Sequence, residues 1–198
     1  MPIITAFEKN GCVYVATDTQ KEIDSVLVNL RDPENVRIKA FENGVIVGCL
    51  GKARLTQLIF ANKQWFDTDK LDKRYIVTQI VPKIYEEIKD LENWKSEEYD
   101  DEKSCSLSVV IAKGKDVFFI TNELNVIKSS GCLSTSYGRG ECMMSAYIRL
   151  SNEDDPETLI KKAFKECSGY NSDAFSSVAV INTKEMKLKF LEGNDDSF

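Results

Sequence analysis

The carboxylate of Asp18 is the first candidate for chemistry, because it ends the second of two short apolar segments near the start of the chain. The dipeptide Asn10-Gly11 joins these segments, and an Asn-Gly pair between alternating hydrophobic residues is a strong signal for a two-residue β-hairpin. Such a turn fixes the register, so we expect Ile3 to face Asp18. The hairpin therefore places a carboxylate beside the amino end of the chain, where an N-terminal nucleophile would lie.

The chain contains no histidine. This excludes Ser-His-Asp and Cys-His catalysis, the HExxH zinc site and histidine-based acid–base chemistry. A hydrolase built on this sequence must use an amine, a lysine or a carboxylate as its base. The six cysteines are scattered without a CxxC pair, and we interpret them as small buried hydrophobic residues. We therefore expect no metal, no disulfide and no cofactor.

Length and composition predict one domain over residues 1–198, because 42% hydrophobic residues in a chain of this length can bury a full core. The net charge of −6, without a basic stripe, argues against a nucleic-acid partner. No apolar run is long enough to span a bilayer, which argues against a membrane partner. The first ten residues resemble neither a signal peptide nor a transit peptide, so we expect a cytoplasmic protein.

Hairpins and pairs of helices account for most of the elements that must position Asp18. A second Asn-Gly pair, Asn43-Gly44, predicts another hairpin, and Pro82 predicts a kink or break in a long helix. Besides the first hairpin, the periodicity predicts strands at 25–28, 36–41, 45–51, 106–112, 117–121, 176–181 and 186–191. Helices are predicted at 53–66, 71–94, 138–150 and 156–167.

The resulting order is strands, two helices, strands, two helices, strands. Antiparallel sheets built from hairpins must bury one apolar face each, and paired helices can cover the outer faces. The sequence therefore predicts an α+β fold in which two antiparallel sheets stack between two helical layers. A generic α+β domain with the same order of elements is the alternative.

Several motifs share a distinctive order and spacing along the chain. They are Ala16-Thr17-Asp18 after the first hairpin, Val36-Arg37-Ile38 followed by the segment 43–51, the helix opening Gly138-Arg139-Gly140, and Val178-Ala179-Val180-Ile181 near the end. In this order they resemble the proteasome β-subunit family and its bacterial two-ring relative. The resemblance covers nearly the whole chain. It implies the four-layer αββα fold of the N-terminal nucleophile hydrolases and subunits that stack into rings.

The resemblance also implies where catalytic residues belong. In that family the mature chain begins with a threonine whose hydroxyl attacks the peptide carbonyl while its free amine acts as base. A lysine lowers the local proton affinity, and an aspartate orients that lysine. Matching the hairpins places Pro2 at the threonine and Asp18 at the aspartate. The lysine falls on Asn35, or on Glu34 if the loop differs by one residue, so the resemblance implies that only the aspartate persists.

Three further family positions lie in the second half of the chain. The serine of the family's Gly-Ser-Gly helix opening corresponds to Arg139. The family's second aspartate and serine correspond to about Gly169 and Ser172, so only Ser172 could persist there. Arg139 could instead bind an anion, because backbone N–H groups at a helix start favour negative charge. A solvent-facing arginine is the simpler interpretation.

Other candidate nucleophiles have simpler structural interpretations. Thr5 should face Ala16 within the strand, so exposing its amine would remove the strand that positions it. Pro2 could offer a secondary amine if Met1 is removed, although a proline that stiffens the strand entry is the simpler interpretation. Three remaining candidates lack a base and are given structural roles: Cys105, Cys132 and Ser134.

Three functional hypotheses follow. The first is a proteasome-like subunit without peptidase activity, a scaffold that assembles with itself in a ring or stack or with proteasome-type partner subunits. The second is a peptidase or amidohydrolase with an atypical nucleophile, either the Pro2 amine or a processed N-terminus, and with a peptide as substrate. The third is a binding module for a peptide or small ligand. Loss of the threonine and of the lysine that tunes its amine favours the first.

Overall fold

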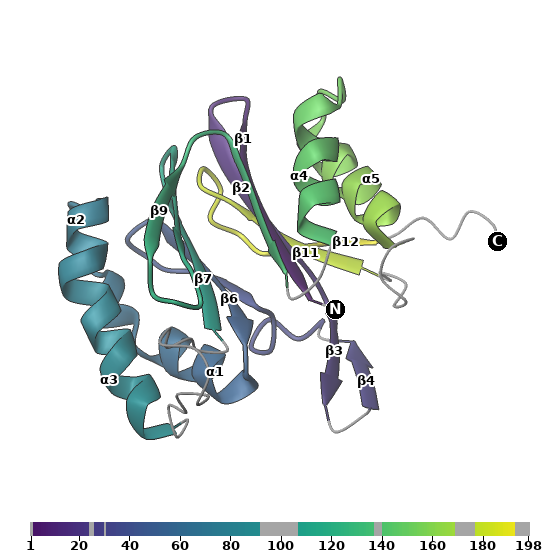
Figure 1. Cartoon of the computed structure of the whole chain (residues 1–198). Helices are drawn as coiled ribbons and strands as arrows, with labels where there is room; N and C mark the ends of the chain where they lie inside the picture. Colours follow the sequence, from purple (N-terminus) through teal and green to yellow (C-terminus); the bar gives the residue numbers. More distant parts are fainter. Residues whose placement is uncertain are drawn as a thin grey trace, which may run out of the picture.

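Two five-stranded antiparallel sheets form the centre of the molecule (Figure 1). This computed structural model describes residues 2–23, 26–29, 31–91, 107–136, 140–168 and 177–192. The first sheet has the order β10-β1-β2-β11-β12, and the second has the order β5-β6-β7-β8-β9. The first contains β1 (Ile3–Lys9), β2 (Cys12–Asp18), β10 (Cys132–Ser136), β11 (Ser177–Asn182) and β12 (Lys189–Glu192). The second contains β5 (Ile38–Ala40), β6 (Val45–Gly51), β7 (Leu107–Lys113), β8 (Asp116–Ile120) and β9 (Val126–Ser129).

Helices cover the outer face of each sheet, and a small hairpin stands at one end. The hairpin consists of β3 (Gln20–Ile23) and β4 (Val26–Asn29), which pair with each other as a separate two-stranded sheet. The second sheet is covered by α1 (Ala53–Ala61), the 3-10 helix η1 (Lys63–Phe66), α2 (Lys73–Tyr75), the π-helix η2 (Ile76–Ile80) and α3 (Val81–Leu91). The first sheet is covered by α4 (Gly140–Leu150) and α5 (Pro156–Ser168). No helix in these described segments is long and apolar enough to cross a membrane.

Three apolar layers hold the four structural layers together. Side chains alternate along β1, so Ile3 and Phe7 pack beneath α4 and α5 while Ile4 and Ala6 pack against the second sheet. A third layer lies between the second sheet and the helices α1 to α3. The predicted four-layer α+β sandwich is therefore confirmed.

The first hairpin has the predicted register. Phe7 pairs with Tyr14 and Thr5 pairs with Ala16. The turn residues have φ values of 53° at Asn10 and 77° at Gly11. Two positive φ values in succession are the signature of the type I′ turn, whose twist matches that of the flanking strands. The Asn-Gly signal therefore identified both the turn and the position of every residue along β1 and β2.

The long second helix changes its hydrogen-bond pattern just before Pro82. Residues Ile76–Ile80 form a π-helix, and the Val81 N–H donates to the carbonyl of Ile76, five residues earlier. A proline lacks the N–H of a helical residue and its ring crowds the preceding turn, so a wider turn relieves the strain. The prediction was a kink or a break at Pro82; the structure instead has the π-helix just before it, and the helix continues without a break to Leu91, the last residue described before the segment 92–106.

Several boundaries differ from the predictions. The helix predicted at 53–66 ends at Ala61, and η1 follows it after Asn62. The strand predicted at 36–41 is confined to Ile38–Ala40. The strand predicted at 186–191 begins at Lys189, because Met186 has a φ of 56°, which does not fit a β-strand. Strands β3, β9 and β10 were not predicted. They are short and rich in polar residues, so hydrogen bonding to neighbouring strands decides their conformation more than periodicity does.

Candidate functional site

The amino end of β1 meets the end of β2 in a buried polar cluster. The Ile3 N–H donates a hydrogen bond of 2.7 Å to Asp18 Oδ1. Thr17 Oγ1 donates a hydrogen bond of 2.9 Å to the carbonyl of Ile3. Both backbone polar groups of Ile3 are thus held by side chains at the end of β2. Asp18 lies beside the start of the chain, where the hairpin register predicts it.

A buried cation accompanies Asp18, and it is Arg37. Its Nη1 lies 3.0 Å from Asp18 Oδ2 and donates a second hydrogen bond of 3.1 Å to the carbonyl oxygen of Asp18. Asp18 is 3% exposed and Arg37 is 8% exposed, so the pair is shielded from water. The resemblance implied the neutral Asn35 or the acidic Glu34 near Asp18, and therefore no cation. The structure corrects that expectation.

The turn before β5 explains the difference. The Asn35 N–H donates to the carbonyl of Asp32 over 2.9 Å, and the Asn35 side chain donates to Asp32 Oδ2 over 3.2 Å. The Glu34 N–H donates to Asp32 Oδ1 over 3.0 Å. This local turn keeps Glu34 and Asn35 at the surface, so the chain reaches the buried Asp18 only at Arg37.

Burial dominates the electrostatics of Asp18. It raises the pKa of the Asp18 carboxyl above its ordinary value, because a charged group loses its hydration. The positive charge of Arg37 and the hydrogen bond from the Ile3 N–H lower the pKa and offset part of this shift. An arginine is almost never buried without a partner, so each of the two residues needs the other to be buried at low cost.

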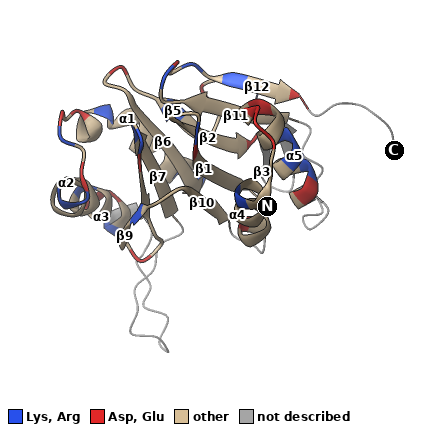
Figure 2. Cartoon of the chain, turned by 90° about the horizontal axis from the view of Figure 1, so that it is seen from above, with Lys and Arg blue, Asp and Glu red and all other residues tan. Residues whose placement is uncertain are grey.

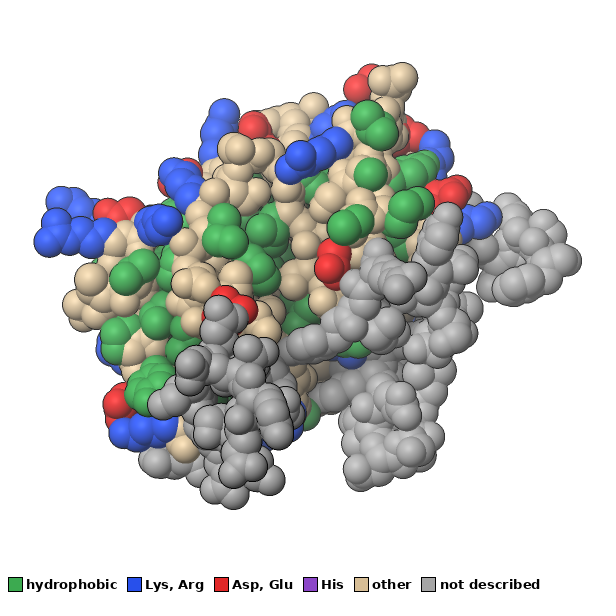
Figure 3. All heavy atoms as spheres, viewed as in Figure 1, with side chains coloured by type: hydrophobic (Ala, Val, Ile, Leu, Met, Phe, Trp, Pro, Cys, Tyr) green, Lys and Arg blue, Asp and Glu red, His purple; other side chains and the backbone are tan. Residues whose placement is uncertain are grey.

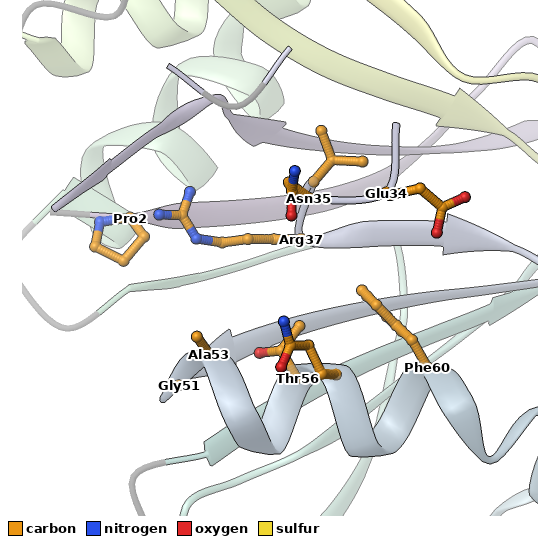
Figure 4. A pocket seen from close by; sticks show the side chains of 10 residues that line it. Pro2, Glu34, Asn35, Arg37, Gly51, Ala53, Thr56 and Phe60 are labelled. Carbon is orange, nitrogen blue, oxygen red and sulfur yellow. The ribbon is translucent and has the colours of Figure 1, made fainter. Parts of the chain in front are cut away.

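A pocket of about 230 Å³ opens beside the pair (Figure 4). Pro2, Asn35 and Arg37 line one side, and residues of α1 that include Thr56 and Phe60 line the other. In Figure 4 the guanidinium of Arg37 points towards the ring of Pro2. Among the described residues that line this pocket, Thr56 alone carries a hydroxyl and none carries a thiol. The pocket therefore combines one cation, the carboxylate of Glu34, amide groups and an apolar floor.

The other candidate nucleophiles of β1 and β10 have structural partners. Thr5 is fully buried, and its Oγ1 lies 3.2 Å from the carbonyl of Leu133 and 2.9 Å from Ser134 Oγ. Burial raises the pKa of the Cys132 thiol, which disfavours the reactive thiolate. These contacts agree with the structural roles predicted for Thr5, Cys132 and Ser134.

The remaining predicted positions lie outside the described residues: Met1, Cys105, Arg139, Gly169 and Ser172. The anion site proposed for Arg139 stays a prediction, although α4 does begin at Gly140. In the described part of the chain, no three or more Cys, Asp or Glu side chains are grouped so that they could hold a metal ion.

Sequence reasoning missed two contributions to the site. The first is Arg37, which lies between Val36 and Ile38 in a segment whose alternation predicts a strand with one polar face, so this pattern carried no sign that its side chain is buried. The second is the link between β2 and β11, where Thr19 Oγ1 donates to the carbonyl of Ser177 over 3.1 Å. Nothing in the sequence pattern placed these two residues together, because 158 positions separate them.

Comparison with known proteins identifies the fold. No protein-family model matches the sequence, and no curated protein matches it either. Among solved structures, BPH from Thiobacillus denitrificans aligns with a TM-score of 0.66 and 18% identity, over 98% of this chain and 100% of that chain. HslV from Trypanosoma brucei aligns with a TM-score of 0.60 and 15% identity, over 91% of this chain and 98% of that chain. The Gly-1 mutant of Anbu from Hyphomicrobium sp. strain MC1 aligns with a TM-score of 0.68 and 10% identity, over 99% of this chain and 90% of that chain.

The chain has the proteasome-like N-terminal nucleophile hydrolase fold. This confirms the resemblance that the order of motifs indicated. Structural matches at 10% to 18% identity establish the proteasome-like fold. They establish nothing about activity, because function resides in the site that a fold carries.

Proposed function

We propose that this chain is a proteasome-like subunit that lacks peptidase activity and serves as a scaffold in an assembly, either with itself or with proteasome-type partner subunits. The observation that carries the proposal is Pro2 at the amino end of β1, beside the pocket. Its side chain has no nucleophilic atom, and covalent acyl transfer requires a nucleophile with a base in reach. The chain contains no histidine, the base that most often activates a hydroxyl such as that of Thr56, and Glu34 is the one carboxylate among the described residues that line the pocket.

The nature of the cation supports the same proposal. A guanidinium keeps its proton at any pH at which proteins fold, so Arg37 cannot accept or relay one. It is also bound to Asp18 through both a side-chain and a main-chain oxygen. The pair therefore links the end of β2 to the residue just before β5, which is a structural role.

The proposal is tested by intact mass and fluorogenic-peptide turnover on wild type, Pro2→Thr and Asp18→Ala. We expect no turnover by wild type. BPH from Thiobacillus denitrificans has been solved in complex with epoxomicin. We expect no epoxomicin adduct in the mass of the wild-type chain. A trimmed chain that turns over peptide, and that loses this activity in Asp18→Ala, would make the protein a working hydrolase instead.

The position of Pro2 favours a second candidate function. If Met1 is removed, Pro2 offers a secondary amine at the pocket, towards which the guanidinium of Arg37 points. Such an amine could act as a base in an amidohydrolase. Two preparations with and without Met1, defined by intact mass, separate the two functions. Turnover by only the preparation that lacks Met1 would favour the amine.

A module that binds a small ligand has less support than the scaffold role. The pocket of about 230 Å³ is smaller than the range of about 300–1,000 Å³ that small-molecule sites usually have. We therefore rank a small-ligand module below the scaffold.

A further inference from the structure

The chain has two Asn-Gly pairs in hairpin turns, Asn10-Gly11 between β1 and β2 and Asn43-Gly44 between β5 and β6. An asparagine that precedes glycine can lose its side-chain amide without an enzyme. The backbone nitrogen of the glycine attacks Cγ of the asparagine, and Nδ2 leaves as ammonia with the proton of that nitrogen. Water then opens the cyclic imide at one carbonyl to give aspartate, or at the other to give isoaspartate. Glycine favours this attack because it has no side chain to hinder the approach.

The turn of the first hairpin leaves Asn10 and Gly11 open to this reaction. Both residues are exposed to solvent. Asn10 Nδ2 donates to the carbonyl of Asp154 over 3.4 Å, which is longer than the roughly 2.7–3.2 Å of an ordinary N–H···O bond. Among the described residues, none accepts a hydrogen bond from the Gly11 N–H. A nitrogen whose proton is not held by an acceptor is easier to deprotonate, and the deprotonated nitrogen is the attacking group.

The second Asn-Gly pair is held at both reacting groups. Asn43 Nδ2 donates a hydrogen bond of 2.6 Å to the carbonyl of Phe66, and Asn43 Oδ1 accepts one of 3.2 Å from the Val45 N–H. The Gly44 N–H donates to the carbonyl of Phe41 over 3.0 Å. The amide that must rotate and the nitrogen that must attack are therefore both restrained. The two turns share a dipeptide and differ in these contacts.

The tip of the first hairpin contacts the loop that joins α4 to α5, at the upper end of the molecule in Figure 1. Lys9 Nζ donates to the carbonyl of Glu153 over 2.7 Å and lies 3.8 Å from Asp154 Oδ1. The loop contains three consecutive acidic residues at 153–155. Lys162 of α5 pairs with Glu153 at 2.5 Å, and Figure 2 shows both signs of charge along this helix. Figure 3 shows charged side chains of both signs at the same upper end, so water reaches this region.

We propose that Asn10 is a site of spontaneous deamidation, and that the reaction releases the hairpin tip from the α4–α5 loop. A carboxylate at position 10 has no N–H to donate, so the contact with the carbonyl of Asp154 is lost. The new negative charge also faces the acidic run 153–155, and like charges repel. Isoaspartate in addition lengthens the main chain by a methylene, which the two-residue type I′ turn does not accommodate. The proposal is independent of the scaffold role.

Peptide mapping by mass spectrometry tests the site on the full chain incubated at mildly alkaline pH. We expect deamidation at Asn10 to be at least about ten-fold faster than at Asn43, because the hydrogen bonds of Asn43 must break first. The same mapping in urea is the control, since unfolding removes both turns, and there we expect similar rates at the two sites. Equal rates in the folded chain, or a difference that persists unchanged in urea, would overturn the proposed structural selection of Asn10.

Hydrogen exchange tests the release of the loop. Asn10→Asp supplies one of the two products, and we expect the amides of residues 151–155 to exchange at least about two-fold faster than in wild type. Asn43→Asp is the matched control, because Asn43 contacts Phe66 and not this loop. We expect it to leave the exchange of residues 151–155 unchanged. Unchanged exchange in Asn10→Asp, or equal acceleration in both variants, contradicts the release.

Discussion

At the scale of single residues, the pairing of Asp18 with Arg37 determines the character of the site. Each residue is too buried to be charged at low cost without the other, and the two oxygens of Asp18 that contact Arg37 hold the guanidinium in one place. The Ile3 N–H occupies the other carboxylate oxygen. Asp18 therefore joins the start of β1, the end of β2 and the approach to β5 at one point.

Removing Arg37 should be costly to the fold. We expect Arg37→Ala to lower the free energy of unfolding by roughly 3–5 kcal/mol, because it leaves a carboxylate buried and unpaired. Lys39→Ala is the control, since Lys39 forms an exposed pair with Glu34 at 3.8 Å and should contribute about 0–1 kcal/mol. Urea unfolding measures both. Equal losses for the two variants would contradict a structural role for the buried pair.

The raised pKa of Asp18 predicts how the free energy of unfolding depends on pH. The folded protein holds the proton of this carboxyl more tightly than the unfolded chain, so ionisation of Asp18 removes stability as the pH rises above the ordinary value of 3.8. Asp18→Asn cannot ionise. We therefore expect the free energy of unfolding of wild type, minus that of Asp18→Asn, to fall as the pH rises above 3.8. A difference that rises with pH would mean that the charge of Arg37 outweighs the cost of burial.

At the scale of elements, the hairpin of β1 and β2 delivers the site. Its turn has positive φ at Asn10 and Gly11, and no heavy atom lies within 4 Å of a Cβ built at Gly11. Any cost of a side chain there is therefore backbone strain and not a clash. Because the register follows from this turn, the turn sets which residue of β1 meets Asp18.

The turn can be tested without touching the site. Gly11→Ala should lower the free energy of unfolding by about 1 kcal/mol or slightly more, because alanine disfavours a φ of 77°. Asn10→Gly should be nearly neutral, since glycine adopts positive φ freely. Thermal and urea unfolding of the two variants provide the comparison. A neutral Gly11→Ala would show that the turn relaxes to another conformation.

At the scale of the whole molecule, the close approach of the two sheets sets the four-layer architecture. A Cβ at Gly48 of β6 would lie 3.2 Å from Ile4 Cδ1 of β1 and 3.3 Å from Ile38 Cγ2 of β5. Glycine at this position lets three strands from two sheets meet without a gap. The apolar layer between the sheets then packs to the density typical of protein interiors.

Enlarging Gly48 should strain this layer progressively. We expect Gly48→Val to lower the free energy of unfolding by about 1–3 kcal/mol, because overpacking forces side chains off their rotamers, and Gly48→Ala to have a smaller effect. Urea unfolding of the series gives the sign and the order. Equal stability of wild type and Gly48→Val would mean that Ile4 and Ile38 move aside at no cost.

The sequence by itself determined the elements whose information is local. Asn10-Gly11 specified a turn, the turn specified the register, and the register placed Asp18 beside Ile3, because a two-residue loop leaves no freedom in pairing. The order of hairpins and helix pairs likewise predicted the layers, since each apolar face needs a cover. Pro82 indicated from its own chemistry that the long helix is irregular, and the π-helix Ile76–Ile80 lies just before it.

Only the tertiary structure decided which cation meets Asp18. Asn35 and Arg37 are two positions apart, and the turn around Asp32 decides which of them reaches the buried carboxylate. Strand β10 is extended because it pairs with β1, more than a hundred residues away in sequence, and its own periodicity does not predict a strand. Contacts between distant segments depend on how the sheets and helices pack together. That packing lies outside any local pattern, and for this reason the site needed the folded chain.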